Sequence, residues 1–247
     1  MKFRAEVYTS EQLDKALNNP HIELVYAPYS ILNDSHVKHS GRIVLVPPLY
    51  LADCEAELKN KLSQLKSNGF NKILVHSIGH IELFSAMDFD LYGGYRLNCL
   101  NSESILFFSE NAVNDIIVSP EITAAQMNSI EADNLGFIAY GYLPLMITRR
   151  CPLKNGKPCN KKYCKRSLED RKGNKLSVIC SENTSEILNS DVLYLADKMN
   201  SFNKTDFAVL KFTVENNVDE IISSYINSEP CKDNNFTRGL YFRGIKE

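Results

Sequence analysis

The feature that most constrains the fold is a regular alternation of short apolar runs with helical patterns along the chain of 247 residues. Eight runs read as strands: Phe3–Tyr8, Ile22–Tyr26, Arg42–Val46, Lys72–Val75, Asp90–Tyr95, Asp115–Val118, Gly136–Tyr140 and Phe207–Phe212. Strands that alternate with helices form parallel sheets. This pattern favours a (β/α)8 TIM-like barrel. An open doubly wound sheet is the alternative, but no Gly-rich dinucleotide loop follows the first run.

Several helices carry terminal signals. Thr9 and Gln12 have the spacing of a capping box at the start of a helix that runs to Leu17. Leu58, Leu62 and Leu65 recur on one helical face. Further helices are expected at residues 102–111 and 217–227. Ser119, Pro120 and Glu121 resemble an N-cap, a first-turn proline and a first-turn acid, so a helix is expected to begin there.

Four of the seven cysteines are crowded into residues 151–180: Cys151, Cys159, Cys164 and Cys180. Thiols that are clustered in a reducing compartment are more often metal ligands or catalysts than disulfides. Four cysteines can hold a tetrahedral zinc or an iron–sulfur cluster. The irregular spacing lacks the CxxC pairs of zinc ribbons and suits a cluster in a long loop better. Cys231, which lies outside this segment, could replace one of these four cysteines as a ligand.

The same segment is strongly basic. Residues 149–175 contain eleven Lys and Arg residues against two acidic ones, whereas the whole chain has a net charge of −2. A charge island of this kind is typical of a phosphate- or carboxylate-binding face, and RNA is the expected partner. The alternative is a solvated loop whose lysines offset the negative charge of a thiolate-bound metal.

The predicted organisation is one barrel-like domain over residues 1–247. It has a Cys-rich basic insertion at 146–182, between strands seven and eight, and a C-terminal tail at 230–247. In a barrel this insertion is a βα loop, on the face where such enzymes do chemistry. The residues Asp170-Arg-Lys-Gly173 predict a hairpin within it. No apolar run approaches the roughly 20 residues of a membrane span, and no signal peptide is apparent, so a cytoplasmic location is expected.

Six short stretches are distinctive: YGYLPLMITRRCP at 140–152, CKRSLEDRKG at 164–173, ILNS at 187–190, FTRGLYFRG at 236–244, LNCLNS at 97–102 and VSPE at 118–121. Together they resemble the collagenase-like peptidase family. That family was named for collagen degradation by an unassigned mechanism. Other members are similar to prephenate-dependent hydroxylases that act on tRNA uridine, rRNA cytidine or a quinone precursor.

The resemblance implies a barrel and, on Cys151, Cys159, Cys164 and Cys180, a 4Fe-4S cluster, with zinc as the alternative. It also implies prephenate as a possible co-substrate. One branch of the family has a cysteine seven residues before the equivalent of Cys151, where this chain has Pro144. The ligand set of this chain is therefore expected to differ from that branch.

The sequence is compatible with three functions. An iron–sulfur-dependent hydroxylase acting on an RNA base or a small aromatic substrate fits the thiols and the basic residues best. A collagenase-like protease is less supported, because the chain has no HExxH and no GxSxG motif. A non-catalytic metal-bearing subunit that binds RNA or another protein is the third. A protein partner or assembly into a homo-oligomer is also compatible with the sequence.

Arginines suit bidentate contacts to carboxylates and phosphates. Polar residues just beyond strands five and six lie where a barrel handles substrate. The candidate substrate-binding residues are Arg96, Asn98, Glu121, Arg149, Arg150, Arg238 and Arg243. For Glu121, helix capping or stabilisation of a first helical turn is the favoured alternative.

Overall fold

The computed structural model describes residues 1–51, 54–154, 167–180 and 184–244. Within these ranges, eight parallel strands close into a barrel, since β13 pairs with both β1 and β7. The barrel strands are β1 (Lys2–Glu6), β2 (Ile22–Pro28), β3 (Ile43–Val46), β4 (Lys72–Val75), β5 (Asp90–Gly93), β6 (Val113–Ile117), β7 (Leu135–Gly141) and β13 (Phe207–Lys211). The predicted (β/α)8 barrel is confirmed, and each strand overlaps one predicted run.

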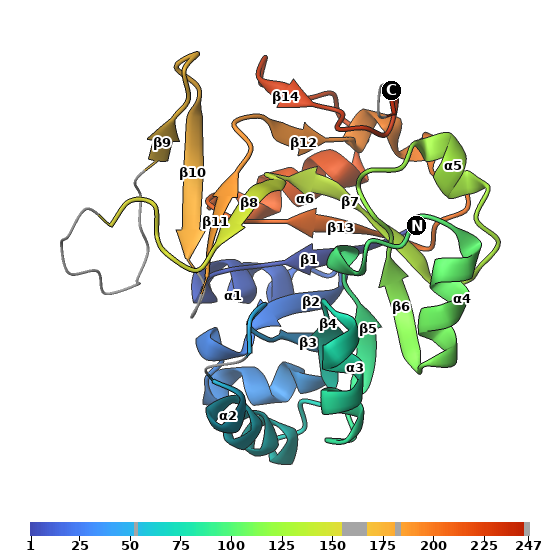
Figure 1. Cartoon of the computed structure of the whole chain (residues 1–247). Coiled ribbons are helices and arrows are strands. Elements are labelled where there is room, and N and C mark those ends of the chain that lie inside the picture. Colours follow the sequence, from blue (N-terminus) through green and yellow to red (C-terminus); the bar gives the residue numbers. More distant parts are fainter. Residues whose placement is uncertain (52–53, 155–166, 181–183, 245–247) are drawn as a thin grey trace.

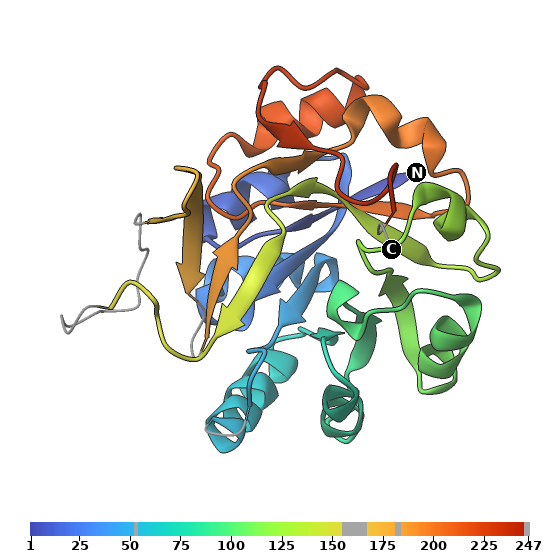
Figure 2. The ribbon, with the colours of Figure 1, turned by 45° about the horizontal axis from the view of Figure 1, so that its top comes forward.

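Helices surround these strands (Figures 1 and 2). They are α1 (Ser10–Asn18), α2 (Glu55–Ser67), α3 (Ile78–Ser85), α4 (Ser102–Glu110), α5 (Ala124–Asn128) and α6 (Val218–Ile226). Short 3-10 segments lie at Tyr29–Ile31, Asp34–Arg42, Tyr95–Leu97 and Ala196–Ser201. The predicted capping box of α1 is present, because Thr9 and Gln12 bond each other's backbone N–H groups. Leu58, Leu62 and Leu65 form the buried face of α2, as predicted.

The helix expected at Ser119 begins later. The capping box of α5 is formed by Thr123 and Gln126, and Ser119 instead accepts a 3.3 Å bond from the N–H of Glu121. That bond closes a local turn, so the prediction of a helix start at Ser119-Pro120-Glu121 was wrong. Thr123 outcompetes Ser119 because Gln126 lies three residues beyond it and returns a bond to its backbone.

The seam between β7 and β13 closes the barrel and requires glycine on β7. A Cβ on Gly136 would lie 2.1 Å from the ring of Phe207. Gly141 has φ +124° and lies against Lys211, where a Cβ would be 2.2 Å from the Lys211 carbonyl oxygen. Side chains at these two positions would push the strands apart, so the glycines permit the close approach.

The barrel interior contains charged side chains as well as apolar ones. Arg4 donates a 3.1 Å bond to the Tyr26 hydroxyl and forms a 2.6 Å ion pair with Asp115. Its guanidinium also lies 3.6 Å from the centre of the Phe207 ring. Because β1 and β6 are not neighbours in the sheet, the Arg4–Asp115 pair crosses the interior.

A second, four-stranded antiparallel sheet is inserted between β7 and β13, with strand order β8-β11-β10-β9. We call it the insertion sheet. It comprises β8 (Pro144–Thr148), β9 (Ser167–Glu169), β10 (Lys175–Cys180) and β11 (Ser185–Leu188). It stands at one side of the barrel, in yellow to orange (Figure 1). Two further short strands, β12 (Val192–Tyr194) and β14 (Phe236–Thr237), pair with each other, and β12 also pairs with the end of β7.

The predicted hairpin in the insertion is confirmed as β9–β10. Its turn is organised by the Asp170 carboxylate, which accepts bonds of 2.7 Å and 2.9 Å from the N–H groups of Lys172 and Asn174. Gly173 has φ +82° there, a conformation that glycine adopts without steric cost.

Candidate functional site

A cluster of polar and aromatic side chains lies where the carboxyl ends of the barrel strands meet. We call this end the barrel mouth. Its side chains come from the ends of four barrel strands or the residues just after them, and from β11: Glu6, Tyr8, His76, Tyr95, Arg96, Glu186 and Lys211. In barrel enzymes this end carries the catalytic residues. Of the seven, only Arg96 was among the candidate substrate-binding residues named from the sequence.

Lys211 and Glu6 form a buried ion pair at the mouth. Lys211 is completely buried and Glu6 is 4% exposed. The two residues are register partners on β13 and β1, and the Lys211 ammonium contacts Glu6 Oε1 and the Tyr8 hydroxyl. The Tyr8 hydroxyl donates a 3.0 Å bond to Glu6 Oε1. A buried ammonium needs such partners, because desolvation of an unpaired charge costs several kcal/mol.

Tyr8 is a proton donor in this arrangement. Burial raises its pKa well above the ordinary value, and the Glu6 and Glu186 carboxylates raise it further. The hydroxyl therefore keeps its proton at neutral pH.

Arg96 and Glu186 form the second ion pair of the mouth. Arg96 Nη2 lies 2.6 Å from Glu186 Oε2, and the guanidinium carbon lies 5.0 Å from the centre of the Tyr95 ring. Their side chains are 16% and 7% exposed. Glu186 comes from β11, so this pair joins the insertion sheet to the barrel.

Three buried atoms of the mouth have no hydrogen-bond partner among the described residues: Glu6 Oε2, His76 Nδ1 and the Tyr95 hydroxyl oxygen. Burial lowers the pKa of His76 well below its ordinary value, and the charges of Arg96, His80 and Lys211 lower it further. His76 is therefore neutral at neutral pH. Buried polar atoms are rarely left unpaired, and those that are indicate a functional role or a bound molecule.

His76 and His80 lie side by side, with their ring centres 6.4 Å apart. The Nδ1 atom of His80 accepts a 3.3 Å bond from the backbone N–H of His76. Burial lowers the pKa of His80 to about 4. In the described part of the chain, no group of three or more Cys, His, Asp or Glu side chains is placed to hold a metal ion.

Asn98 and Glu121 lie on exposed loops beside the mouth. Asn98 adopts a left-handed conformation with φ +54°, and its Oδ1 accepts a 2.7 Å bond from the Ser119 hydroxyl. The same Ser119 oxygen accepts the N–H of Glu121. These bonds tie the loop after β5 to the loop after β6, which gives both residues a structural role.

Cys151 and Cys180 lie at one end of the insertion sheet. Ser185 is the register partner of both Cys180 and Thr148, and Cys151 follows Thr148 by three residues. Cys180 Sγ lies 3.5 Å from the Ser185 hydroxyl oxygen. Both cysteines are partly buried. Cys159 and Cys164 lie outside the described residues.

The remaining candidate arginines are Arg149 and Arg150 in the insertion and Arg238 and Arg243 in the tail. The Arg149 guanidinium is 4.2 Å from the centre of the Tyr50 ring, next to the exposed Arg150. Arg238 donates a 2.8 Å bond to Asp197 and a 2.7 Å bond to the Tyr194 carbonyl, so it anchors the tail. Arg243 is exposed.

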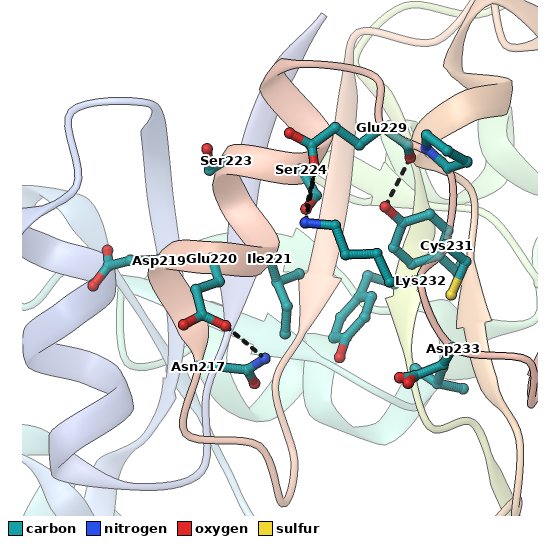
Figure 3. A pocket seen from close by; sticks show the side chains of 14 residues that line it. Asn217, Asp219, Glu220, Ile221, Ser223, Ser224, Glu229, Cys231, Lys232 and Asp233 are labelled. Carbon is teal, nitrogen blue, oxygen red and sulfur yellow. Dashed lines mark hydrogen bonds and ion pairs between the residues drawn. The ribbon is translucent and has the colours of Figure 1, made fainter.

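A pocket of about 500 Å³ lies beside α6 (Figure 3). Its lining includes four carboxylates, Asp219, Glu220, Glu229 and Asp233. Cys231 lines it too.

The model of peptidase family U32 matches residues 31–219 of the chain. The matched region contains Arg96, Glu186, Lys211 and the whole insertion sheet. No curated protein and no solved structure matches the chain. None of the helices in the described ranges combines the length and apolar character of a membrane span.

Proposed function

Since the chain belongs to peptidase family U32, we propose that it is an iron–sulfur-dependent hydroxylase acting on an RNA base or a small aromatic substrate. One observation carries this proposal. Cys180 contacts Ser185, and the next residue along β11, Glu186, is bonded to Arg96 in the barrel mouth. The cysteine-bearing end of the insertion sheet is thus one residue away from the polar cluster of the mouth.

We propose that Cys151, Cys159, Cys164 and Cys180 hold a 4Fe-4S cluster, with zinc as the alternative. The chemistry of the donors supports this set, because thiolates are the ligands of such clusters. The shared end of the sheet at Thr148, Ser185 and Cys180 supports it as well. When bound, the cluster supplies electrons or a Lewis-acidic iron.

The residues of the mouth suit the binding and protonation of an oxygen-rich substrate. Arg96 can hold a carboxylate or phosphate group. Tyr8 keeps a proton that it can donate, with Lys211 and Glu6 holding its hydroxyl in place. We propose prephenate as the co-substrate, because it is a dicarboxylate and Arg96 can hold a carboxylate group.

RNA is the proposed macromolecular substrate. Arg149 and Arg150 directly precede Cys151, so the basic residues lie next to a proposed cluster ligand. Phosphate contacts from such residues position a nucleic acid without reading its sequence. Tyr50, held against Arg149, adds an aromatic surface of the kind on which unpaired bases stack.

Proteolysis finds less support in the described residues. Cys99 is completely buried, and burial raises its pKa to about 11, so its thiol stays protonated. His80 already accepts a backbone bond with Nδ1.

Anaerobic purification followed by iron, sulfide and visible-absorption analysis tests the cluster. RNA mass spectrometry after deletion of the gene tests the reaction, and a lost base hydroxylation is expected. A cluster-bearing protein with an unchanged RNA profile would reject RNA as the substrate and leave a small aromatic substrate or an accessory role. Turnover of gelatin by the pure chain, abolished by substitution of a Cys or His, would favour the protease instead.

A further inference from the structure

Glu186 differs from the other charged groups of the mouth in its origin. Glu6, Arg96 and Lys211 belong to the barrel strands and the residues that directly follow them, whereas Glu186 is carried by β11 of the insertion sheet. It reaches the mouth with its side chain 7% exposed. The barrel therefore supplies two cations and one anion, and the insertion supplies the anion that balances them.

Without Glu186 the mouth would carry one uncompensated positive charge. Lys211 is already paired with Glu6, and His76 lies next to both cations as a neutral side chain. The unbalanced charge would be that of Arg96. A buried guanidinium that has lost its partner binds an oxyanion strongly, because nothing else offsets its desolvation.

The bond between Arg96 and Glu186 leaves donors unused. Arg96 makes a single 2.6 Å contact to Glu186, through Nη2 alone, and no other hydrogen bond of its side chain is formed within the described residues. A guanidinium has five N–H donors and pairs best with two oxygens of one group. Unpaired acceptor and hydroxyl atoms lie in the same cluster, at Glu6 and Tyr95.

We propose that Glu186 is an internal substitute for an oxyanion group of the substrate, and that this group, a carboxylate or a phosphate, displaces it from Arg96. The inference rests on the proposed function only in taking the barrel mouth as the substrate site. In this arrangement Glu186 occupies the anion position on Arg96, and an arriving carboxylate or phosphate takes its place.

The test is calorimetric titration of the anaerobically purified holoprotein with malonate and, separately, with inorganic phosphate. E186Q keeps the shape of the side chain and removes the competing charge. We expect it to bind one or both anions at least about tenfold more tightly than the wild type, and R96Q to bind neither. If only malonate binds more tightly to E186Q, the substrate group that displaces Glu186 is a carboxylate. If only phosphate binds more tightly, that group is a phosphate.

D197N is the matched control, because it breaks the Arg238–Asp197 ion pair away from the mouth. Should E186Q fail to fold by circular dichroism, E186D keeps the charge but shortens the reach, and a smaller increase in affinity is expected. Equal anion affinities in the wild type and the folded Glu186 variant would overturn the proposal. Tightened anion binding without any hydroxylation would reject the proposed function and leave this inference intact.

Discussion

The two ion pairs of the barrel mouth differ in what they connect. Lys211 and Glu6 come from neighbouring barrel strands and are register partners, so the fold itself holds them together. Arg96 and Glu186 are 90 residues apart and join the barrel to an inserted sheet. In the first pair Lys211 is completely buried and Glu6 is 4% exposed, whereas Arg96 retains 16% exposure. The Lys211–Glu6 pair therefore holds two barrel strands together, whereas the Arg96–Glu186 pair is the one that we propose exchanges its partner.

The largest effect is expected from K211M. This change leaves the Glu6 carboxylate buried without its cation, which typically costs about 3–5 kcal/mol in the free energy of unfolding. Urea denaturation measures it. K198M, which removes a surface lysine that lies 3.9 Å from Asp197, should change the same quantity by less than about 0.5 kcal/mol. Equal losses in the two variants would show that the enclosed pair has no special structural role.

Acid should destabilise the fold through two buried histidines, His76 of the mouth and His80 of α3. Burial lowers the pKa of His80 to about 4 and that of His76 well below its ordinary value. The unfolded chain, with histidine pKa values near ~6.5, binds more protons than the folded one below that pH. The unfolding free energy should therefore fall by about 2–3 kcal/mol from pH 6.5 to pH 4 through His80 alone.

The variant H80N is expected to show a shallower fall over this range in denaturation curves at several pH values. An unchanged slope in H80N would mean that His80 is not held neutral by its burial.

The exchangeable pair should contribute less to stability than the enclosed one. A double-mutant cycle with R96Q and E186Q is expected to give a coupling energy of about 1–2 kcal/mol. The exposed Glu11–Lys15 pair of α1 should give about 0.3–0.5 kcal/mol in a parallel cycle. A coupling as large as the loss in K211M would contradict the distinction between the two pairs.

The smallest effect is expected at the outer surface of the insertion. R150Q should weaken RNA binding uniformly across sequences and reduce the slope of log affinity against log salt by about one. Filter binding at several salt concentrations measures it. The change K59Q on α2 serves as the control and should leave the slope unaltered. Identical slopes for wild type and R150Q would remove Arg150 from the RNA-binding face.

The barrel could be predicted from sequence because each strand is a short apolar run and the runs alternate with helical patterns. The site was harder to predict, since it depends on register and closure. Glu6 and Lys211 are single charges at the ends of apolar runs, 205 residues apart, and only the closing of β13 onto β1 brings them together. The local signal that could have indicated Glu6 and Lys211 is a single charged residue at the end of each apolar run.

Two other features could not be predicted from local sequence patterns either. Helix α3 lacks a side-chain cap, and Gly79 within it argues locally against a helix, so it was not anticipated. Glu186 lies in an insertion whose strands pair antiparallel, and nothing local indicates that this carboxylate reaches Arg96. By contrast, Arg96 comes three residues after the end of β5, a confirmed strand, and its place at the mouth could be inferred from that position alone.

The proposed function depends on a cluster held beside the barrel mouth by the cysteine-bearing end of the insertion sheet. Its most direct test is iron and acid-labile sulfide analysis of anaerobically purified wild type, C180S and C231S. We expect iron and sulfide in equal amounts in the wild type and in C231S, whose thiol lines the separate pocket beside α6, and loss of both in C180S. A colourless wild-type protein that holds zinc, or a C180S variant with full iron content, would contradict it.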